Sequence, residues 1–76
     1  MNKEELDHII SELQRTKRPK EISIRELHNA LGWAKRSNRS IPYAKHYLLE
    51  KSIITEPDLE STWSLYIDSK IKLKYN

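Results

Sequence analysis

The apolar positions near the start of the chain repeat with the period of an α-helix. Four of them are spaced i, i+3, i+4 and i+7, namely Leu6, Ile9, Ile10 and Leu13. This spacing predicts an amphipathic helix over about residues 2–15. Asn2 can cap its first turn while Glu5 bonds back to it. The pattern breaks at residues 16–20, which hold Pro19, so we expect a linker there.

A second helix is predicted by its start and stop signals. Ser23 and Glu26 have the spacing of a capping box, in which each side chain bonds the backbone of the other residue. Gly32 stands where a left-handed residue ends a helix. We therefore expect a short helix over about residues 24–31.

A third helix is predicted over about residues 39–51. Its apolar stripe consists of Ile41, Ala44 and Leu48 at i, i+3 and i+7. Either Ser37 or Ser40 can cap it, and Pro42 favours the later start because proline fits only the first turn of a helix.

The apolar period changes to two in the last third of the chain. Apolar side chains alternate with others over residues 63–67 and again over residues 71–75, a pattern that is typical of half-buried strands. We expect a closing β-hairpin with Asp68 and Ser69 near its turn. Residues 53–54 can supply one more short strand.

Three helices followed by a β-hairpin is the element order of a winged helix-turn-helix domain of the α+β class. A chain of 76 residues forms one domain at most, so residues 1–76 are expected to be a single winged-helix domain. For this mass the folded accessible surface scales to about 4,900 Å². Such a domain has little core to spare for a deep catalytic cavity.

The positive charge is concentrated in the middle of the chain. Residues 15–51 carry ten basic against three acidic side chains, for a net charge of +7, whereas residues 1–14 carry −3 and residues 52–76 carry −1. A basic block interrupted by Trp33 and Tyr43 suits a polyanion-binding face. The alternative is an ordinary solvated surface on a lysine-rich protein.

Composition argues against several classes of protein. Without cysteine there is no disulfide framework or thiolate metal site, which favours a reducing, cytoplasmic location. No apolar run approaches the length of a membrane span, and we expect no membrane association. The histidines at positions 8, 28 and 46 lack metal-ligand spacing, and we expect His8 and His28 to be partly exposed. No catalytic set is visible, so we expect neither an enzyme nor a cofactor or metal.

The third predicted helix carries candidate DNA-reading residues. At 100° per residue its apolar stripe points inward, so Arg39, Tyr43, His46 and Glu50 point outward. An arginine can fork onto guanine in the major groove, and a tyrosine or histidine can bond phosphate or pack on a thymine methyl. Lys45 on the same helix is a further candidate for DNA contact.

Other basic residues are candidates for contacts with the DNA backbone. In the turn before the third helix, Lys35, Arg36 and Asn38 can bond phosphates, or the turn can simply be solvated. Lys70, Lys72 and Lys74 lie on one face of the last predicted strand. They are interpreted as protection of an edge strand against aggregation, with contact between a wing and DNA as the alternative for Lys70 and Lys72.

Two further features bear on the DNA-binding hypothesis. Trp33 and Trp63 can stack on bases, but tryptophans in so small a domain are expected in the core. The acidic segment 55–60 would be a poor neighbour for DNA, so we expect it to face away from any nucleic acid.

Several motifs resemble a known family. They are Ile24 to Leu27, Leu31 to Trp33, Lys35-Arg36, Leu48, Thr55-Glu56-Pro57-Asp58-Leu59-Glu60 and Tyr66-Ile67-Asp68. Over about residues 22–73 the chain resembles small winged-helix modules of prokaryotic multidomain proteins, which often precede paired CBS (cystathionine-β-synthase-type) domains or other effector domains. The resemblance implies a nucleic-acid-binding or sensory input domain, and it implies that this chain is the amino-terminal domain of a longer protein.

Two functions follow as hypotheses from different classes. The first is a regulator or targeting module that binds double-stranded DNA through the third helix and the basic turn, with RNA as a variant of the same mode. The second is a protein-interaction or dimerisation module without nucleic-acid binding, whose partner is a second copy of the chain, an attached effector domain or another protein.

Overall fold

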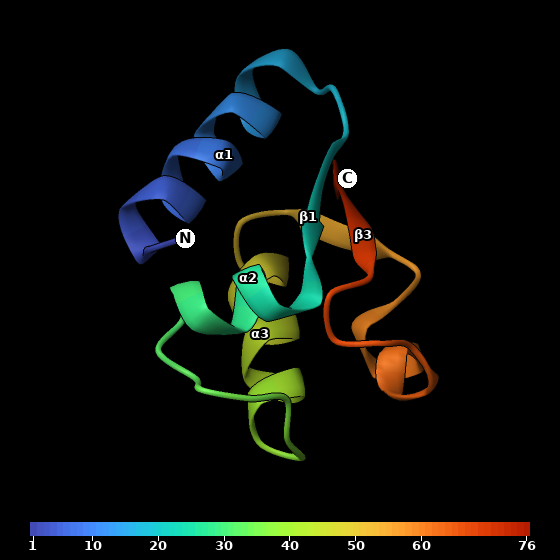
Figure 1. Ribbon diagram of the computed structural model, residues 1–76. Helices are drawn as coiled ribbons and strands as arrows, with labels where there is room; N and C mark the ends of the chain where they lie inside the picture. Colours follow the sequence, from blue (N-terminus) through green and yellow to red (C-terminus); the bar gives the residue numbers. More distant parts are fainter.

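The computed structural model describes residues 1–76. In chain order the elements are α1 (Lys3–Thr16), β1 (Lys20–Ser23), α2 (Ile24–Ala30), α3 (Ser40–Leu49), β2 (Ile53–Glu56), the 3-10 helix η1 (Leu59–Ser64) and β3 (Lys70–Tyr75). The α+β class expected from the sequence is confirmed, with four helices and one three-stranded antiparallel sheet. The three α-helices lie together on one side of the sheet (Figure 1).

The predicted helix signals are confirmed at their expected positions. Asn2 Oδ1 accepts from Glu5 N at 2.8 Å and caps α1, whose inner face buries Leu6, Ile10 and Leu13. Gly32, just after α2, has a φ of 88°, in the left-handed region. Glycine reaches this conformation without the Cβ clash that other residues meet, so the chain can turn sharply there.

The sheet contains a strand that the sequence did not predict. Residues 16–20 were expected to form a linker, but Lys20–Ser23 pairs antiparallel with β3, with Ile22 opposite Ile71. Only one of these four residues is a large apolar side chain. In so short a strand the alternation of apolar and polar residues is too brief to predict a strand. The strand with which it pairs, β3, lies at the far end of the chain.

The predicted hairpin is corrected by the structure. Residues 63–67 do not form a strand; instead Leu59–Ser64 is a 3-10 helix, and β3 pairs with β1 on one side and β2 on the other. Both edges of β3 are therefore occupied. The short strand expected at residues 53–54 is confirmed as part of β2, and it is the partner of β3 in place of residues 63–67.

One apolar core joins the helices to the sheet. It contains 14 buried residues, to which α1, α2, α3, all three strands and η1 contribute. Leu59 and Thr62 of η1 are fully buried, and η1 packs against α3. The accessible surface is 4863 Å², in agreement with the value of about 4,900 Å² expected from mass.

Candidate nucleic-acid interface

The orientation predicted for the third helix is confirmed. Ile41, Ala44 and Leu48 of α3 are buried, with exposed fractions of 2% or less. The opposite face carries the side chains proposed to read DNA, namely Arg39, Tyr43, His46 and Glu50, and all four are exposed. His46 Nε2 lies 2.9 Å from Glu50 Oε1, so this pair occupies the carboxyl-terminal end of the exposed face. Arg39 and Tyr43 lie toward its beginning.

Two serines fix the start of α3. Ser37 Oγ accepts from Ser40 N at 3.0 Å, and Ser40 Oγ accepts from Ser37 N at 2.7 Å. The residue at the cap position is Arg39, whose side chain makes no capping bond, so neither predicted serine occupies it. The two serines instead satisfy two backbone N–H groups in a reciprocal arrangement at the start of the helix. The helix begins at Ser40 and ends at Leu49, slightly inside the predicted bounds.

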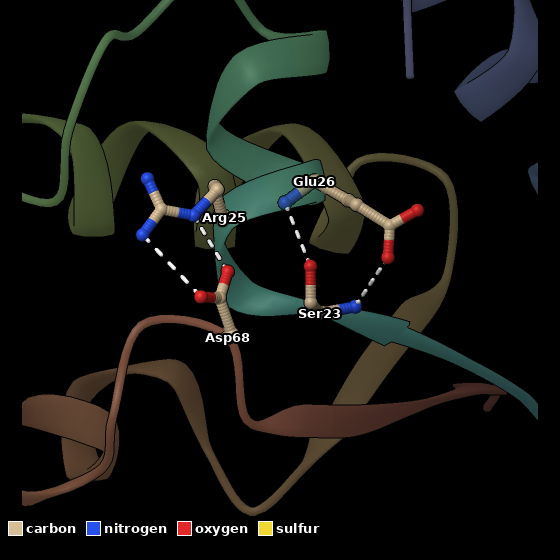
Figure 2. Close-up of polar contacts among 4 residues, drawn as sticks. All are labelled: Ser23, Arg25, Glu26 and Asp68. Carbon is tan, nitrogen blue, oxygen red and sulfur yellow. Dashed lines mark hydrogen bonds and ion pairs between the residues drawn. The ribbon is translucent and has the colours of Figure 1, made fainter.

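A polar framework holds α2 beside the segment that leads into β3 (Figure 2). The predicted capping box is present, with Glu26 N donating to Ser23 Oγ and Ser23 N donating to Glu26 Oε1, both at 3.0 Å. These bonds hold the pKa of Glu26 below its usual range. Arg25 forms a two-bond pair with Asp68, with Nε 2.6 Å from Oδ1. The chain around Asp68 is thus tied to the first turn of α2.

The basic turn between α2 and α3 exposes most of its polar side chains. Lys35, Asn38 and Arg39 are exposed, and neither Lys35 nor Arg39 forms an ion pair. Arg36 is different, because its guanidinium donates to the Thr62 carbonyl at 2.5 Å and lies 5.4 Å from the centre of the Trp63 ring. Arg36 therefore fastens the turn to η1, and its charge is not neutralised by a carboxylate.

The expectation that both tryptophans are core residues is wrong. Trp63 has an exposed fraction of 49%, and Trp33 is half-buried. Trp33 packs edge-to-face against Tyr43, with ring centroids 6.0 Å apart. Neither ring belongs to the buried core, and both lie beside the basic turn, Trp33 at its start and Trp63 under Arg36.

The acidic segment lies closer to α3 than the sequence predicted. Lys45 Nζ is 3.0 Å from Asp58 Oδ2 and 2.9 Å from Glu60 Oε1. The bonds to Glu60 and Asp58 raise the pKa of Lys45. Two carboxylates of the segment 55–60 thus meet a lysine of α3, while its orientation toward nucleic acid stays a prediction. The cation at Lys45 is already paired.

The lysines of the last strand do not protect an edge. β3 is the central strand of the sheet, so that interpretation is wrong. Lys72 stands between Glu21 of β1 and Glu56 of β2 on the outer face, and Lys74 forms an ion pair with Glu56 that lowers the pKa of this carboxyl. Lys70 is exposed and has no ion pair.

His28 is more deeply buried than the sequence predicted. It was expected to be partly exposed, but its exposed fraction is 1%. A signal was present, because Ile24, Leu27, His28 and Leu31 share the i, i+3, i+4 and i+7 spacing of one helical face. The histidine occupies an apolar position of that face.

No family model, curated protein or solved structure matches the chain. None of the helices has the length and apolar character needed to cross a membrane. No three His, Cys, Asp or Glu side chains come together in a way that could hold a metal ion.

Proposed function

We propose that this chain is a winged helix-turn-helix domain that binds double-stranded DNA through α3 and the turn before it. The order is α1-β1-α2-α3-β2-η1-β3, with the strands arranged β1-β3-β2. Apart from η1 between the last two strands, this order is typical of winged helix-turn-helix domains. In such domains the helix that follows the turn lies in the major groove. The proposal makes α3 the reading helix.

The proposal rests on one observation about charge and exposure. α3 buries its aliphatic side in the core and leaves Arg39 and Tyr43 exposed, and the adjoining turn carries two further cations without carboxylate partners, Lys35 and Arg36. Phosphate contacts from such cations position a protein on DNA, whereas side chains on the helix read base edges.

The predicted contacts do not all carry equal weight. Lys35, Arg36 and Asn38 are assigned to phosphates at the amino-terminal end of α3, and Arg39, Tyr43 and His46 to the groove. Lys45 contributes little while it is paired with Asp58 and Glu60. Lys70 has a free ammonium group on the outer face of the sheet and remains a candidate for backbone contact, while Lys72 is flanked by two glutamates.

The proposal is tested by fluorescence anisotropy of labelled duplex DNA at several salt concentrations. The affinity is expected to fall with salt, with a log–log slope of about −0.9 per phosphate contacted. The double variant Lys35→Gln/Arg39→Gln is expected to bind roughly tenfold more weakly and with a shallower slope. The control Arg18→Gln/Lys20→Gln removes the same charge between α1 and β1. Equal losses in both double variants would contradict the proposal.

A second candidate function is favoured by a mainly apolar groove beside α3 and β2, whose lining also includes Lys45 and Asp58. Leu49 and Ile54 are exposed to 49% and 37%, and with Leu48, Ile53 and Leu59 they line a groove of about 250 Å³. Exposed apolar surface of this kind is typical of protein-interaction sites. Sedimentation without DNA separates the two functions, because a self-associating module has a mass that rises with concentration.

A further inference from the structure

One edge of the sheet has backbone groups that pair with nothing. The strand order β1-β3-β2 places β1 and β2 at the two edges. In an antiparallel pair, successive residues of a strand alternately bond the neighbouring strand and face away from it. Asn76 N donates to Ser52 O at 2.8 Å, so Ile54 bonds β3, and the N–H and C=O groups of Ile53 and Thr55 point to the free edge. No loop or cap bond satisfies these groups.

The opposite edge is interrupted by the start of α2. Ile24 N donates to Ser69 O at 3.1 Å, so the same alternation turns the backbone groups of Glu21 and Ser23 outward on β1. Ser23 N is already used, because it donates to Glu26 Oε1 at 3.0 Å in the capping box, and α2 begins at the next residue. β2 is therefore the edge at which a further strand can be added.

The open edge carries apolar side chains and no charge along three successive residues. These are Ile53, Ile54 and Thr55, whereas many edge strands carry a lysine or a proline that prevents pairing. Ile54 is exposed to 37%, and Leu49, which lines the groove beside β2, is exposed to 49%. A row of backbone donors and acceptors is matched by an extended chain, so the edge suits a β-strand as its partner.

The ends of β2 select one antiparallel register with a second β2. Ser52 has a φ of 61°, in the left-handed region, and Pro57 has no N–H to donate, so the pairing lies within the strand itself. With Ile53 opposite Thr55 of a second copy, all the outward groups are paired and a two-fold axis passes between the two copies of Ile54. In either neighbouring register Ile53 would face Pro57, or Thr55 would face the turn before β2.

We propose that two copies of this chain associate through antiparallel pairing of their β2 strands, which joins their three-stranded sheets into one. The facing pairs are Ile53 with Thr55 and Ile54 with its own copy, so no like charges meet along the ladder. The ladder is short, so the association is weak and depends on concentration. This inference rests on the second candidate function, for which it names the partner and the contact, and it does not depend on DNA binding.

Sedimentation equilibrium of the full chain without DNA tests the association. The weight-average mass is expected to rise from that of the monomer toward twice this value between about 10 µM and about 1 mM protein. A mass that stays at the monomer value over this range overturns the proposal. Because no DNA is present, a failure here is separate from a failure of DNA binding, which anisotropy measures.

A pair of charge variants tests the position of the two-fold axis. Ile54→Glu places two carboxylates face to face and Ile54→Lys places two ammonium groups there, so each variant alone is expected to associate roughly tenfold more weakly than wild type. An equimolar mixture brings opposite charges together and is expected to recover the association. Ile54 is partly exposed, and circular dichroism verifies that both variants keep the fold. A mixture that associates no more tightly than its components overturns this register.

A single cysteine gives a second test of the same contact. The chain has no cysteine of its own, and facing residues in an antiparallel pair that lack mutual hydrogen bonds have Cα atoms about 4.5 Å apart, within reach of a disulfide. In a glutathione redox buffer, Ile54→Cys is expected to form a linked dimer at least about tenfold faster than Glu21→Cys, which is exposed on the opposite edge strand. Equal rates for the two variants overturn the proposal.

Discussion

Lys45 of α3 is paired with Asp58, which lies just before η1, at a distance of 3.0 Å between Nζ and Oδ2. Glu60 approaches the same ammonium group at 2.9 Å. A segment far along the chain thus supplies carboxylates to the helix that we propose reads DNA. If α3 binds DNA as proposed, these carboxylates compete with phosphate for Lys45 and limit non-specific affinity.

Removing these carboxylates should strengthen DNA binding. We expect Asp58→Asn/Glu60→Gln to raise the affinity for duplex DNA roughly three- to tenfold at low salt. If Lys45 then contacts one phosphate, the log–log slope of affinity against salt concentration should become steeper by about 0.9. Glu12→Gln on α1, which removes a carboxylate paired with Arg15, is the control. An unchanged affinity of the double variant, measured by anisotropy, would show that α3 does not meet DNA at Lys45.

His28 should make stability depend on pH. Its pKa is lowered in the folded protein, so the unfolded chain binds the proton first as the pH falls below about 6.5. The free energy of unfolding should therefore decrease below that pH, with a slope of up to about 1.4 kcal/mol per pH unit for one proton. The decrease in the free energy of unfolding ends once the pH is below the folded-state pKa of His28.

The measurement is urea unfolding between neutral and mildly acidic pH. At pH values slightly under about 6.5, His28→Gln should remove most of the dependence of the free energy of unfolding on pH. His8→Gln, at an exposed position of α1, should retain this dependence. A wild-type slope that persists in His28→Gln contradicts the assignment. Glu26 and Glu56 do not confuse the result, because their pKa values lie below the usual range for a glutamate.

Tyr47 should couple α3 to α1. Its hydroxyl donates to Asp7, and burial together with this bond raises the pKa of Tyr47 to about 12. Tyr47→Phe should lower the free energy of unfolding at neutral pH by about 1 kcal/mol. The contribution of Tyr47 is present below pH of about 10 and is lost as the pH rises toward the folded-state value. The difference between wild type and variant should therefore shrink in alkaline urea titrations.

Gly32 should be replaceable only at a conformational cost. Its φ is 88°, and a Cβ at this position would meet no atom within 4 Å. The cost of Gly32→Ala therefore comes from the backbone alone and should be about 1–2 kcal/mol in thermal or urea unfolding. Gly32→Asn should cost less, because asparagine adopts left-handed conformations more readily. A larger loss for asparagine than for alanine would contradict this explanation.

Local sequence signals predicted the helices well. The capping signals act within a few residues. Asn2 and the Ser23–Glu26 capping box bond backbone N–H groups, and Gly32 allows the left-handed turn after α2, so these roles can be predicted without knowing the fold. The inward face of α3 also followed from its spacing. These features correctly indicated which side of α3 is exposed.

Features set by distant parts of the chain could not be predicted in the same way. The alternation over residues 63–67 suits a strand, but β3 already has β1 and β2 as neighbours, and Thr62 Oγ1 bonds the Leu59 carbonyl within a 3-10 helix. The pairing of Lys45 with the acidic segment and the bond from Arg36 to η1 likewise depend on tertiary contacts. The sequence therefore indicated the basic residues of the proposed interface but not which of them are already held in ion pairs or hydrogen bonds within the protein.

The central claim is that DNA contacts the exposed face of α3 and the basic turn. The most direct test is NMR mapping of backbone amide resonances on the full chain as duplex DNA is added at moderate salt. If DNA binds there, the largest shifts fall within residues 35–46, with α1 nearly unaffected. Shifts confined to α1 or to the groove at Leu49 and Ile54, or no shifts at all, would contradict it.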